Sequence, residues 1–181
     1  ATRARSKDNT RMVPERTRVV GTSRVSLLLQ PCGHVGGDLI GFFCPEPGRL
    51  GLYGIDVSGH GITSAMVTAR VAGYMSNAFL DQNLALERRI DQTFELRPPS
   101  DTAKLLNDRL CADPGVDEYL TMGYVAGDLN TGRMSLVQAG HPPPILMRAN
   151  GTMEFPGTGG LPVGLVDGVD YEQTAFVMAP G

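Results

Sequence analysis

The chain has 181 residues, of which 41% are hydrophobic, and this size and composition fit one domain with a sizeable core. No apolar run approaches the roughly 18 residues that a membrane helix needs, and the polar, arginine-rich start does not resemble a secretory signal. We therefore expect a soluble globular protein, and its three cysteines, which form no disulfide pattern, fit reduced thiols in the cytoplasm. The net charge is −3, and residues 1–20 carry six Lys or Arg against two acidic residues. The acidic remainder argues against nucleic acid as the main partner, and we expect a basic tail or linker end at 1–18 and one domain at 19–181.

Three strands are predicted first along the chain. Residues 19–30 are rich in Val, Leu and Ser, and residues 38–43 and 50–57 form two further apolar runs. Prolines and glycines separate these runs and indicate turns. Short links between successive strands favour an antiparallel meander.

Two helices are predicted next. The first runs from Thr63 or Ser64 to about residue 80, with apolar side chains on two faces. Residues 81–99 are charged and end in two prolines, so we expect a helix end and a mobile loop there. Ser100 is a suitable N-cap for a second helix that ends near Leu110.

The rest of the chain predicts strands again. Residues 119–127 and 134–139 are predicted to form a hairpin around the turn at 130–132. Residues 144–148 and 152–155 predict another hairpin, 157–164 a glycine-rich loop, and 171–178 a last strand. Strands, then two helices, then strands are typical of the α+β class.

Two aspartates stand at corresponding places in this pattern. Asp38 begins the second predicted strand, directly after Gly36 and Gly37, and Asp56 lies near the end of the third. The start of one antiparallel strand lies beside the end of its neighbour, so both carboxylates can reach one spot, where hard cations such as Mg²⁺ take oxygen ligands. The alternative, which the spacing alone favours, is that each aspartate caps a turn.

Other candidates for chemistry are isolated in the sequence. The loop Gly59-His60-Gly61 precedes a helix and offers N–H groups to a phosphate, but the known nucleotide-binding glycine motifs are absent. A nucleotide-binding module is therefore the weaker hypothesis. His60 has the chemistry of a general acid, although a lone histidine in a tight loop is more often structural, and we interpret His141, which precedes three prolines, as structural. The three cysteines form no C-x-x-C pair, which argues against a zinc site and a disulfide framework.

Several short motifs follow one another in a specific order. They are VGGD at 35–38, IDVSGHG at 55–61, SAM at 64–66, QAGHPPP at 138–144, NG at 150–151 and GLPVGL at 160–165. From about Val25 onward, this ordered set resembles the metal-dependent (PPM, type 2C) serine/threonine phosphatases, and in particular their bacterial SpoIIE/RsbU branch.

The resemblance implies a fold and a metal centre. The fold is an α-β-β-α sandwich of two antiparallel sheets flanked by helices, with a two-metal Mg²⁺ or Mn²⁺ centre at the sheet edges. Asp38 and Asp56 correspond to the family's metal-binding, catalytic aspartates, and Val57 corresponds to a residue whose backbone carbonyl binds metal. The family continues with two further aspartates that complete the centre, and this sequence ends before them. We therefore expect 19–181 to be an incomplete phosphatase-like domain whose metal positions are empty or singly filled.

The resemblance also implies a function. We expect hydrolysis of phosphoserine or phosphothreonine on a regulatory protein such as an anti-sigma-factor antagonist, controlled by an upstream sensory or response-regulator receiver domain. The alternative is a non-catalytic binding module of the same fold, which the missing aspartates support and Asp38 and Asp56 oppose. A homodimer is left open. We expect residues 81–99 to be a mobile flap near the site or, equally, a plain surface connection.

Overall fold

The computed structural model describes residues 17–30 and 36–180. The first 16 residues of the predicted basic tail lie outside this range, and so do Cys32 and the valine of the VGGD motif. Thr17 and Arg18, which the sequence assigned to the tail, form the start of a strand.

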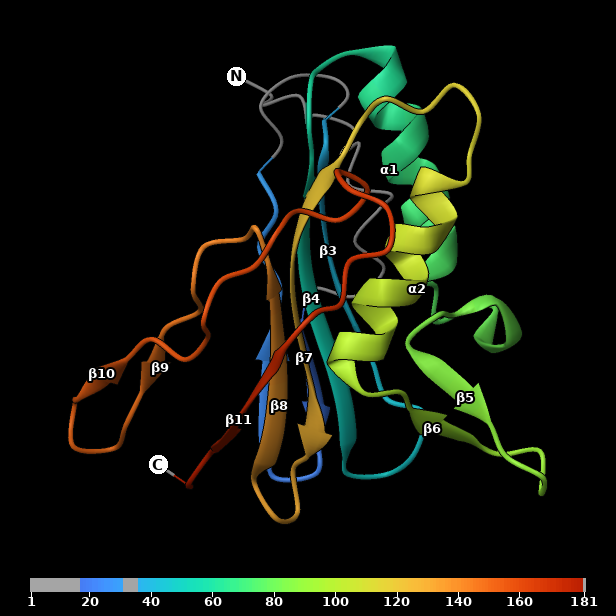
Figure 1. Ribbon diagram of the computed structural model, residues 1–181. Coiled ribbons are helices and arrows are strands. Elements are labelled where there is room, and N and C mark those ends of the chain that lie inside the picture. The colour runs from blue at the N-terminus through green and yellow to red at the C-terminus, as the bar shows by residue number, and fades with distance from the viewer. Residues whose placement is uncertain (1–16, 31–35, 181) are drawn as a thin grey trace, which may run out of the picture.

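An antiparallel five-stranded sheet forms the centre of the molecule (Figure 1). Its strand order is β11-β8-β7-β4-β3. The strands are β3 (Asp38–Phe43), β4 (Arg49–Val57), β7 (Leu120–Asp128), β8 (Arg133–Ala139) and β11 (Gln173–Val177). The central strands match the predicted ranges closely because each alternates buried and more exposed residues and ends at a turn.

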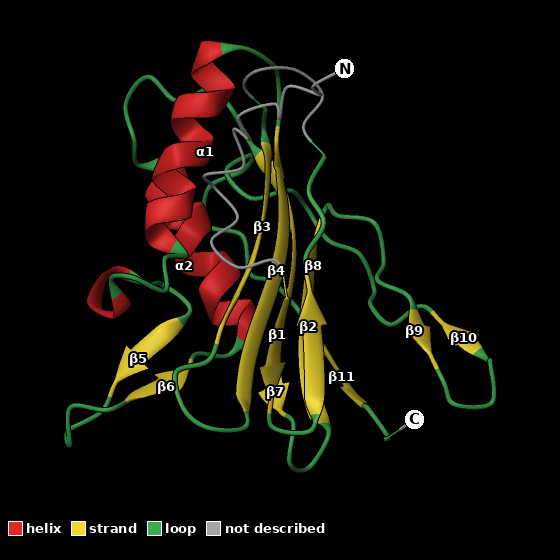
Figure 2. Cartoon of the chain, turned by 180° about the vertical axis from the view of Figure 1, so that it is seen from behind, coloured by secondary structure: helices red, strands yellow, loops and turns green. Residues whose placement is uncertain are grey.

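Both helices cover the same face of this sheet (Figure 2). Helix α1 (Ile62–Tyr74) packs on β3 and β4, and α2 (Pro99–Cys111) packs on β7 and β8. The core between the layers contains Val71 from α1, Leu106 from α2 and Tyr124 from β7, each with no exposed surface. Alternate residues of each strand face this core, so the intervening residues, including Asp38 and Asp56, face the other side.

A two-stranded ribbon lies against the opposite face of the sheet. It consists of β1 (Thr17–Val20) and β2 (Ser23–Ser26). The prediction of one strand over 19–30 was wrong because Gly21 turns the chain with a φ of 59°. Val20 and Val25 pack here in a second, smaller core cluster. The α+β class with antiparallel sheets is confirmed. In the part of the chain that the structure describes, this ribbon is the second β layer, and α1 and α2 share one side.

The ends of the two helices differ from the sequence prediction. Helix α1 ends at Tyr74 instead of near residue 80. The segment that follows the helix is held by hydrogen bonds of the buried Asn83 side chain. This side chain accepts a hydrogen bond from the Ala85 N–H at 2.9 Å and donates one to the Ser76 carbonyl at 3.0 Å. Helix α2 begins at Pro99, and no side chain caps it, so Ser100 is not the N-cap.

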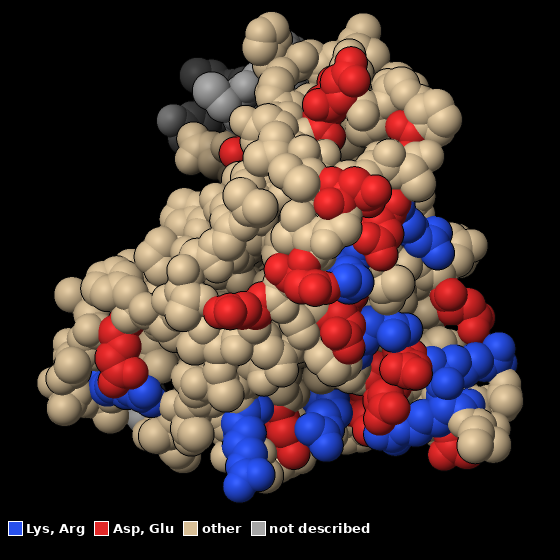
Figure 3. Space-filling model, in the orientation of Figure 1, with Lys and Arg blue, Asp and Glu red and all other residues tan. Residues whose placement is uncertain are grey.

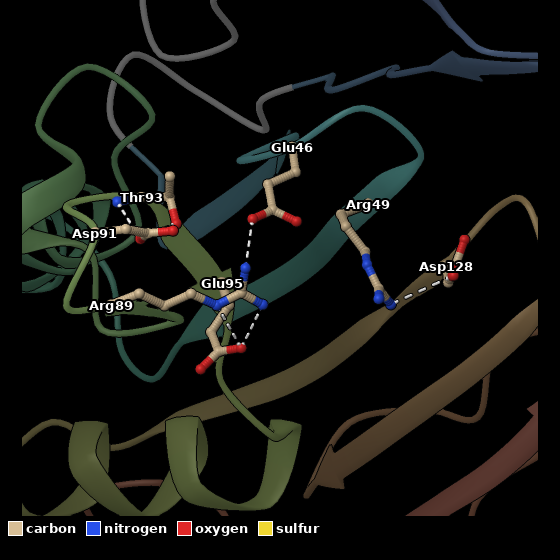
Figure 4. A network of polar contacts seen from close by, with 7 residues as sticks. All are labelled: Glu46, Arg49, Arg89, Asp91, Thr93, Glu95 and Asp128. Atoms are coloured by element: carbon tan, nitrogen blue, oxygen red, sulfur yellow. Dashed lines mark hydrogen bonds and ion pairs between the residues drawn. The ribbon is translucent and has the colours of Figure 1, made fainter.

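Residues 81–99 are folded and lie far from Asp38. They contain the 3₁₀ turn η1 (Leu80–Gln82) and the hairpin of β5 (Leu86–Arg88) with β6 (Phe94–Leu96). Leu84 to Leu86 are buried. In the network of Figure 4, Arg89 binds Glu95 of its own hairpin and Glu46 of the β3–β4 turn.

The position of that turn overturns the prediction of a flap near the site. Asp38 is the first residue of β3, whereas Glu46 lies in the turn that follows the last residue of this strand. Strand β4 separates the two ends by nine residues, which corresponds to roughly 26 Å at 3.3 Å per residue. Of the two interpretations of 81–99, the surface connection fits the structure.

The C-terminal part forms the predicted hairpin and loops. The hairpin consists of β9 (Leu146–Met147) and β10 (Met153–Glu154). Buried Asn107 of α2 fixes the following loops: its Oδ1 accepts hydrogen bonds from the Gly164 N–H and the Tyr171 hydroxyl, and its Nδ2 donates to the Val166 carbonyl. None of the helices described here is long and apolar enough to cross a membrane.

Charged side chains are unevenly distributed over the molecule. They gather over α2, the β5–β6 hairpin and the adjoining end of the sheet (Figure 3). The left side of this view is mostly uncharged apart from one acidic and one basic group at β9 and β10, where Arg148 pairs with Glu154. A cavity of about 570 Å³ at the charged end of the sheet is lined in part by Arg49, Arg97 and Arg133. It does not include Asp38 or Asp56.

Candidate metal centre

Asp38 and Asp56 lie directly opposite each other on neighbouring strands. Asp38 is the first residue of β3 and pairs in register with Asp56 near the end of β4. The adjacent pair is hydrogen-bonded, with the Val57 N–H donating to the Gly37 carbonyl at 3.1 Å. The two aspartates therefore occupy a non-hydrogen-bonded position, where Cα atoms approach to about 4.5 Å and side chains are closest. The adjacency predicted from the sequence is confirmed, and both side chains are exposed to solvent.

A close backbone contact lies beside this pair. A Cβ atom at Gly37 would meet the Val57 carbonyl oxygen at 2.4 Å and the Asp56 Oδ1 at 3.3 Å. Position 37 therefore requires glycine, because any side chain would collide with the Val57 carbonyl oxygen and crowd the Asp56 carboxylate. The Val57 side chain faces the core with 2% of its surface exposed, so only its backbone is available to the site.

Helix α1 supports the start of β3 from behind. The Thr68 hydroxyl lies 3.2 Å from the Gly37 carbonyl and 2.8 Å from the Ser64 carbonyl within its own helix. Thr68 and Ser64 are both buried, and the Ser64 hydroxyl has no hydrogen-bond partner among the described residues. The position of Gly37, and with it Asp38, is therefore linked to the packing of α1.

The loop after β4 keeps His60 at the surface. The Ser58 N–H donates to the Tyr119 carbonyl at 2.8 Å, and the Ser58 hydroxyl accepts from the Tyr119 N–H at 3.0 Å. Gly59 and Gly61 have φ values of 81° and 87°, a conformation that favours glycine. No hydrogen bond or ion pair of the described residues involves the exposed His60 ring, so the structure does not join His60 to the aspartates.

His141, interpreted as structural from the sequence, lies on the same face as the two aspartates. Its Nδ1 is 2.8 Å from the Thr121 hydroxyl, and Thr121 of β7 pairs in register with Asp56. Burial lowers the pKa of His141, whereas the negative charges of Asp56 and then Asp38 act to raise it. The sequence signal was the QAGHPPP motif, but the spacing alone did not indicate that this ring would contact Thr121, the residue that pairs with Asp56.

The donor set fits a hard cation. Two carboxylates and a backbone carbonyl are oxygen ligands of the kind that Mg²⁺ takes, with waters completing its shell, and the missing Cβ of Gly37 leaves room beside them. Among the described residues, no three His, Cys, Asp or Glu side chains converge as a metal site. The structure thus brings Asp38, Asp56 and Val57 together at the predicted place. Their role as metal ligands stays a prediction.

A cavity adjoins the aspartates on this face of the sheet. It has a volume of about 470 Å³ and is lined by Ile40 of β3, Gly54 of β4, Gly123 of β7 and His141, among others. Ile40 and Gly54 are each two residues from one of the aspartates, on the same side of the sheet. The face away from the helices therefore combines the acidic pair with an open concave surface.

Comparisons with known proteins identify the family of the chain. Residues 46–181 match the family model described as Stage II sporulation protein E (SpoIIE). The chain is 25% identical over 144 residues to the phosphoserine phosphatase RsbP of Bacillus subtilis (strain 168), covering 79% of this chain and 33% of that protein. The chain thus spans about a third of the curated relative's length.

Solved structures show the same fold. The PP2C phosphatase domain of SpoIIE from Bacillus subtilis, solved with a fragment of its regulatory domain, has a TM-score of 0.59 and 14% identity, covering 81% of this chain and 39% of that one. RsbX, solved in complex with magnesium, has a TM-score of 0.62 and 11% identity, covering 87% and 68%. At these identities the likeness concerns the fold alone.

Proposed function

Since the chain belongs to the SpoIIE family, whose model matches residues 46–181, we propose that it is part of a metal-dependent serine/threonine protein phosphatase. The proposed reaction is the hydrolysis of phosphoserine or phosphothreonine on a regulatory protein. The observation that carries the proposal is the in-register pairing of Asp38 with Asp56. The similarity to the phosphoserine phosphatase RsbP supports the same class of reaction.

The residues of the site have distinct tasks in this proposal. Asp38 and Asp56 hold Mg²⁺ or Mn²⁺ through their carboxylates, the Val57 carbonyl supplies a third oxygen, and Gly37 leaves the space that these groups need. The magnesium in the RsbX structure supports the choice of ion. Divalent cations, when bound in such a site, make a water molecule more acidic and neutralise charge on the phosphoryl group.

The substrate and the regulation are further parts of the proposal. We propose a phosphorylated anti-sigma-factor antagonist as the substrate and an upstream sensory or receiver domain as the regulator, in the cytoplasm. The regulatory-domain fragment in the SpoIIE structure supports a regulated phosphatase. A pull-down with phosphorylated and unphosphorylated forms of the antagonist tests the choice of substrate.

A second candidate function is a binding module of the same fold without hydrolysis. It is favoured by the observation that no three metal-ligating side chains converge among the described residues, since a complete phosphatase centre needs more carboxylates than Asp38 and Asp56.

The experiment that separates the two functions is a metal titration. Calorimetry with Mn²⁺ on this chain, and hydrolysis of p-nitrophenyl phosphate by a C-terminally extended form of it, are compared for the wild type, Asp56→Asn and the control Asp81→Asn. Asp81 is an exposed carboxylate in η1, beyond the C-terminal end of α1. We expect Asp56→Asn alone to lose metal binding and turnover. Unchanged metal-dependent turnover in Asp56→Asn contradicts the site, and wild-type protein that binds Mn²⁺ without turnover supports the binding module.

A further inference from the structure

The ring of His141 lies on a surface formed by two glycines. Gly54 of β4 and Gly123 of β7 face each other in register. A Cβ atom at Gly123 would lie 3.0 Å from His141 Cδ2, and one at Gly54 would lie 3.5 Å from His141 Nε2. A Cβ at Gly123 would crowd the imidazole, whereas one at Gly54 would lie in ordinary contact with it, so the ring lies directly on these two glycines.

Both the ring and the backbone of His141 are held by hydrogen bonds. The Thr121 hydroxyl contacts Nδ1 at 2.8 Å. The side-chain amide Nε2 of Gln138 donates to the His141 backbone carbonyl at 2.6 Å, and the Gly159 N–H in turn donates to Oε1 of the same Gln138 side chain at 2.9 Å. A ring fixed at Nδ1 has only Nε2 available for a ligand, and Nε2 is the nitrogen that lies over β4.

His141 lies at the end of a row of residues that includes both aspartates. Asp38, Asp56 and Thr121 form a row across β3, β4 and β7, and His141 is attached to the β7 end of this row. The Thr121 hydroxyl is both a donor and an acceptor, and when it donates to Nδ1 the proton of the neutral ring is on Nε2. His141 does not complete a three-residue metal cluster with the aspartates in the described part of the chain, so it is placed beside the metal centre and not within it.

We propose that His141 binds the phosphoryl group of the substrate, donating a hydrogen bond from Nε2 to a non-bridging oxygen of a phosphomonoester held beside Asp38 and Asp56. Thr121 is a positioning residue in this proposal, because its hydroxyl occupies Nδ1 and, as the donor to Nδ1, leaves the ring proton on Nε2. The inference rests on the proposed phosphatase function and assigns a binding role to a residue outside the metal ligands. No bond forms or breaks in this step.

The tautomer is testable without any turnover. Long-range ¹H–¹⁵N spectra of the ¹⁵N-histidine-labelled chain distinguish Nε2–H from Nδ1–H, and Thr121→Val serves to assign the effect of the hydroxyl. We expect Nε2–H in the wild-type chain and a shift of the Nε2 resonance when inorganic phosphate is added with Mg²⁺. An unprotonated Nε2, or resonances of His141 that do not respond to phosphate, would overturn the proposal.

Kinetics of the C-terminally extended form of the chain provide the second test. A hydrogen bond to a charged group contributes about 1.5 to 3 kcal/mol, so His141→Leu should raise KM about 10- to 150-fold with a smaller change in kcat, as loss of ground-state binding does. His141→Gln keeps an N–H donor and should recover part of the affinity. The KM of Thr121→Val should lie between those of His141→Leu and the wild type. The control Thr152→Val, in the exposed β9–β10 turn, should have the wild-type KM.

The outcomes distinguish this inference from the proposed function. Urea unfolding of each variant first establishes that it is folded. An unchanged KM in His141→Leu overturns the phosphate-binding role and leaves the phosphatase assignment intact. A wild-type protein without metal-dependent hydrolysis refutes the phosphatase assignment, and in that case the tautomer and the response to phosphate still decide whether His141 binds the anion.

Discussion

Replacing Gly37 with alanine introduces a methyl group at the closest backbone approach of the candidate site. The new Cβ would lie 2.4 Å from the Val57 carbonyl oxygen, which is about 1 Å inside ordinary contact distance. The neighbour is backbone within a paired strand, so it cannot rotate away as a flexible side chain would. Forcing an extra carbon into a well-packed position costs about 1 to 3 kcal/mol. With a urea m-value of about 2 kcal/mol/M, the unfolding midpoint should fall by roughly 0.5 to 1.5 M.

The neighbouring glycine provides a matched control. A Cβ at Gly36 would meet its nearest atom, the Asp38 nitrogen, at 3.9 Å, so Gly36→Ala creates no clash. It should leave the midpoint unchanged or raise it, because alanine reduces the entropy of the unfolded chain. Equal midpoints for Gly36→Ala and Gly37→Ala would refute the steric reasoning. Gly37→Ala should also weaken Mn²⁺ binding, since the start of β3 must move away from Val57.

Three further predictions concern charge, a buried amide and a buried phenol. Asp56→Asn should stabilise the metal-free chain by on the order of 0.5 kcal/mol, because like charges directly opposite each other in a sheet repel; lower stability in urea unfolding with chelator would contradict this. Asn107→Ala should lower the free energy of unfolding by about 3 kcal/mol, because buried partners lose their hydrogen bonds, whereas Asn150→Ala in an exposed turn should cost much less. Burial raises the pKa of Tyr171 to about 12, so the folded chain keeps a proton that the unfolded chain loses near pH 10. Stability should therefore fall as the pH rises from 10 to 12, and less steeply in Tyr171→Phe; equal slopes would show that Tyr171 does not ionise differently in the two states.

The parts of the fold that the sequence predicted depend on local signals. Strands β3 and β4 have clear ends and a short turn between them, so their antiparallel pairing, and hence the meeting of Asp38 and Asp56, follows from the chain order. The β5–β6 hairpin was missed because its strands are only three residues long, too short for a periodic pattern. The position of His141 was missed because it depends on a glycine from each of two other strands, which no local spacing reveals.

The acidic pair has a consequence for the edge of the sheet. Strand β3 is the outermost strand on its side, and its first residue carries one of the two carboxylates while the inner strand carries the other. An ion bound by both would join an edge strand to the strand beside it, so opening of that edge would require release of the ion. Hydrogen exchange of the β3 amides should then slow as the metal concentration rises above its dissociation constant. In this chain the occupancy of the site and the integrity of the sheet edge are therefore expected to be one coupled equilibrium, which amide exchange can measure in the absence of substrate.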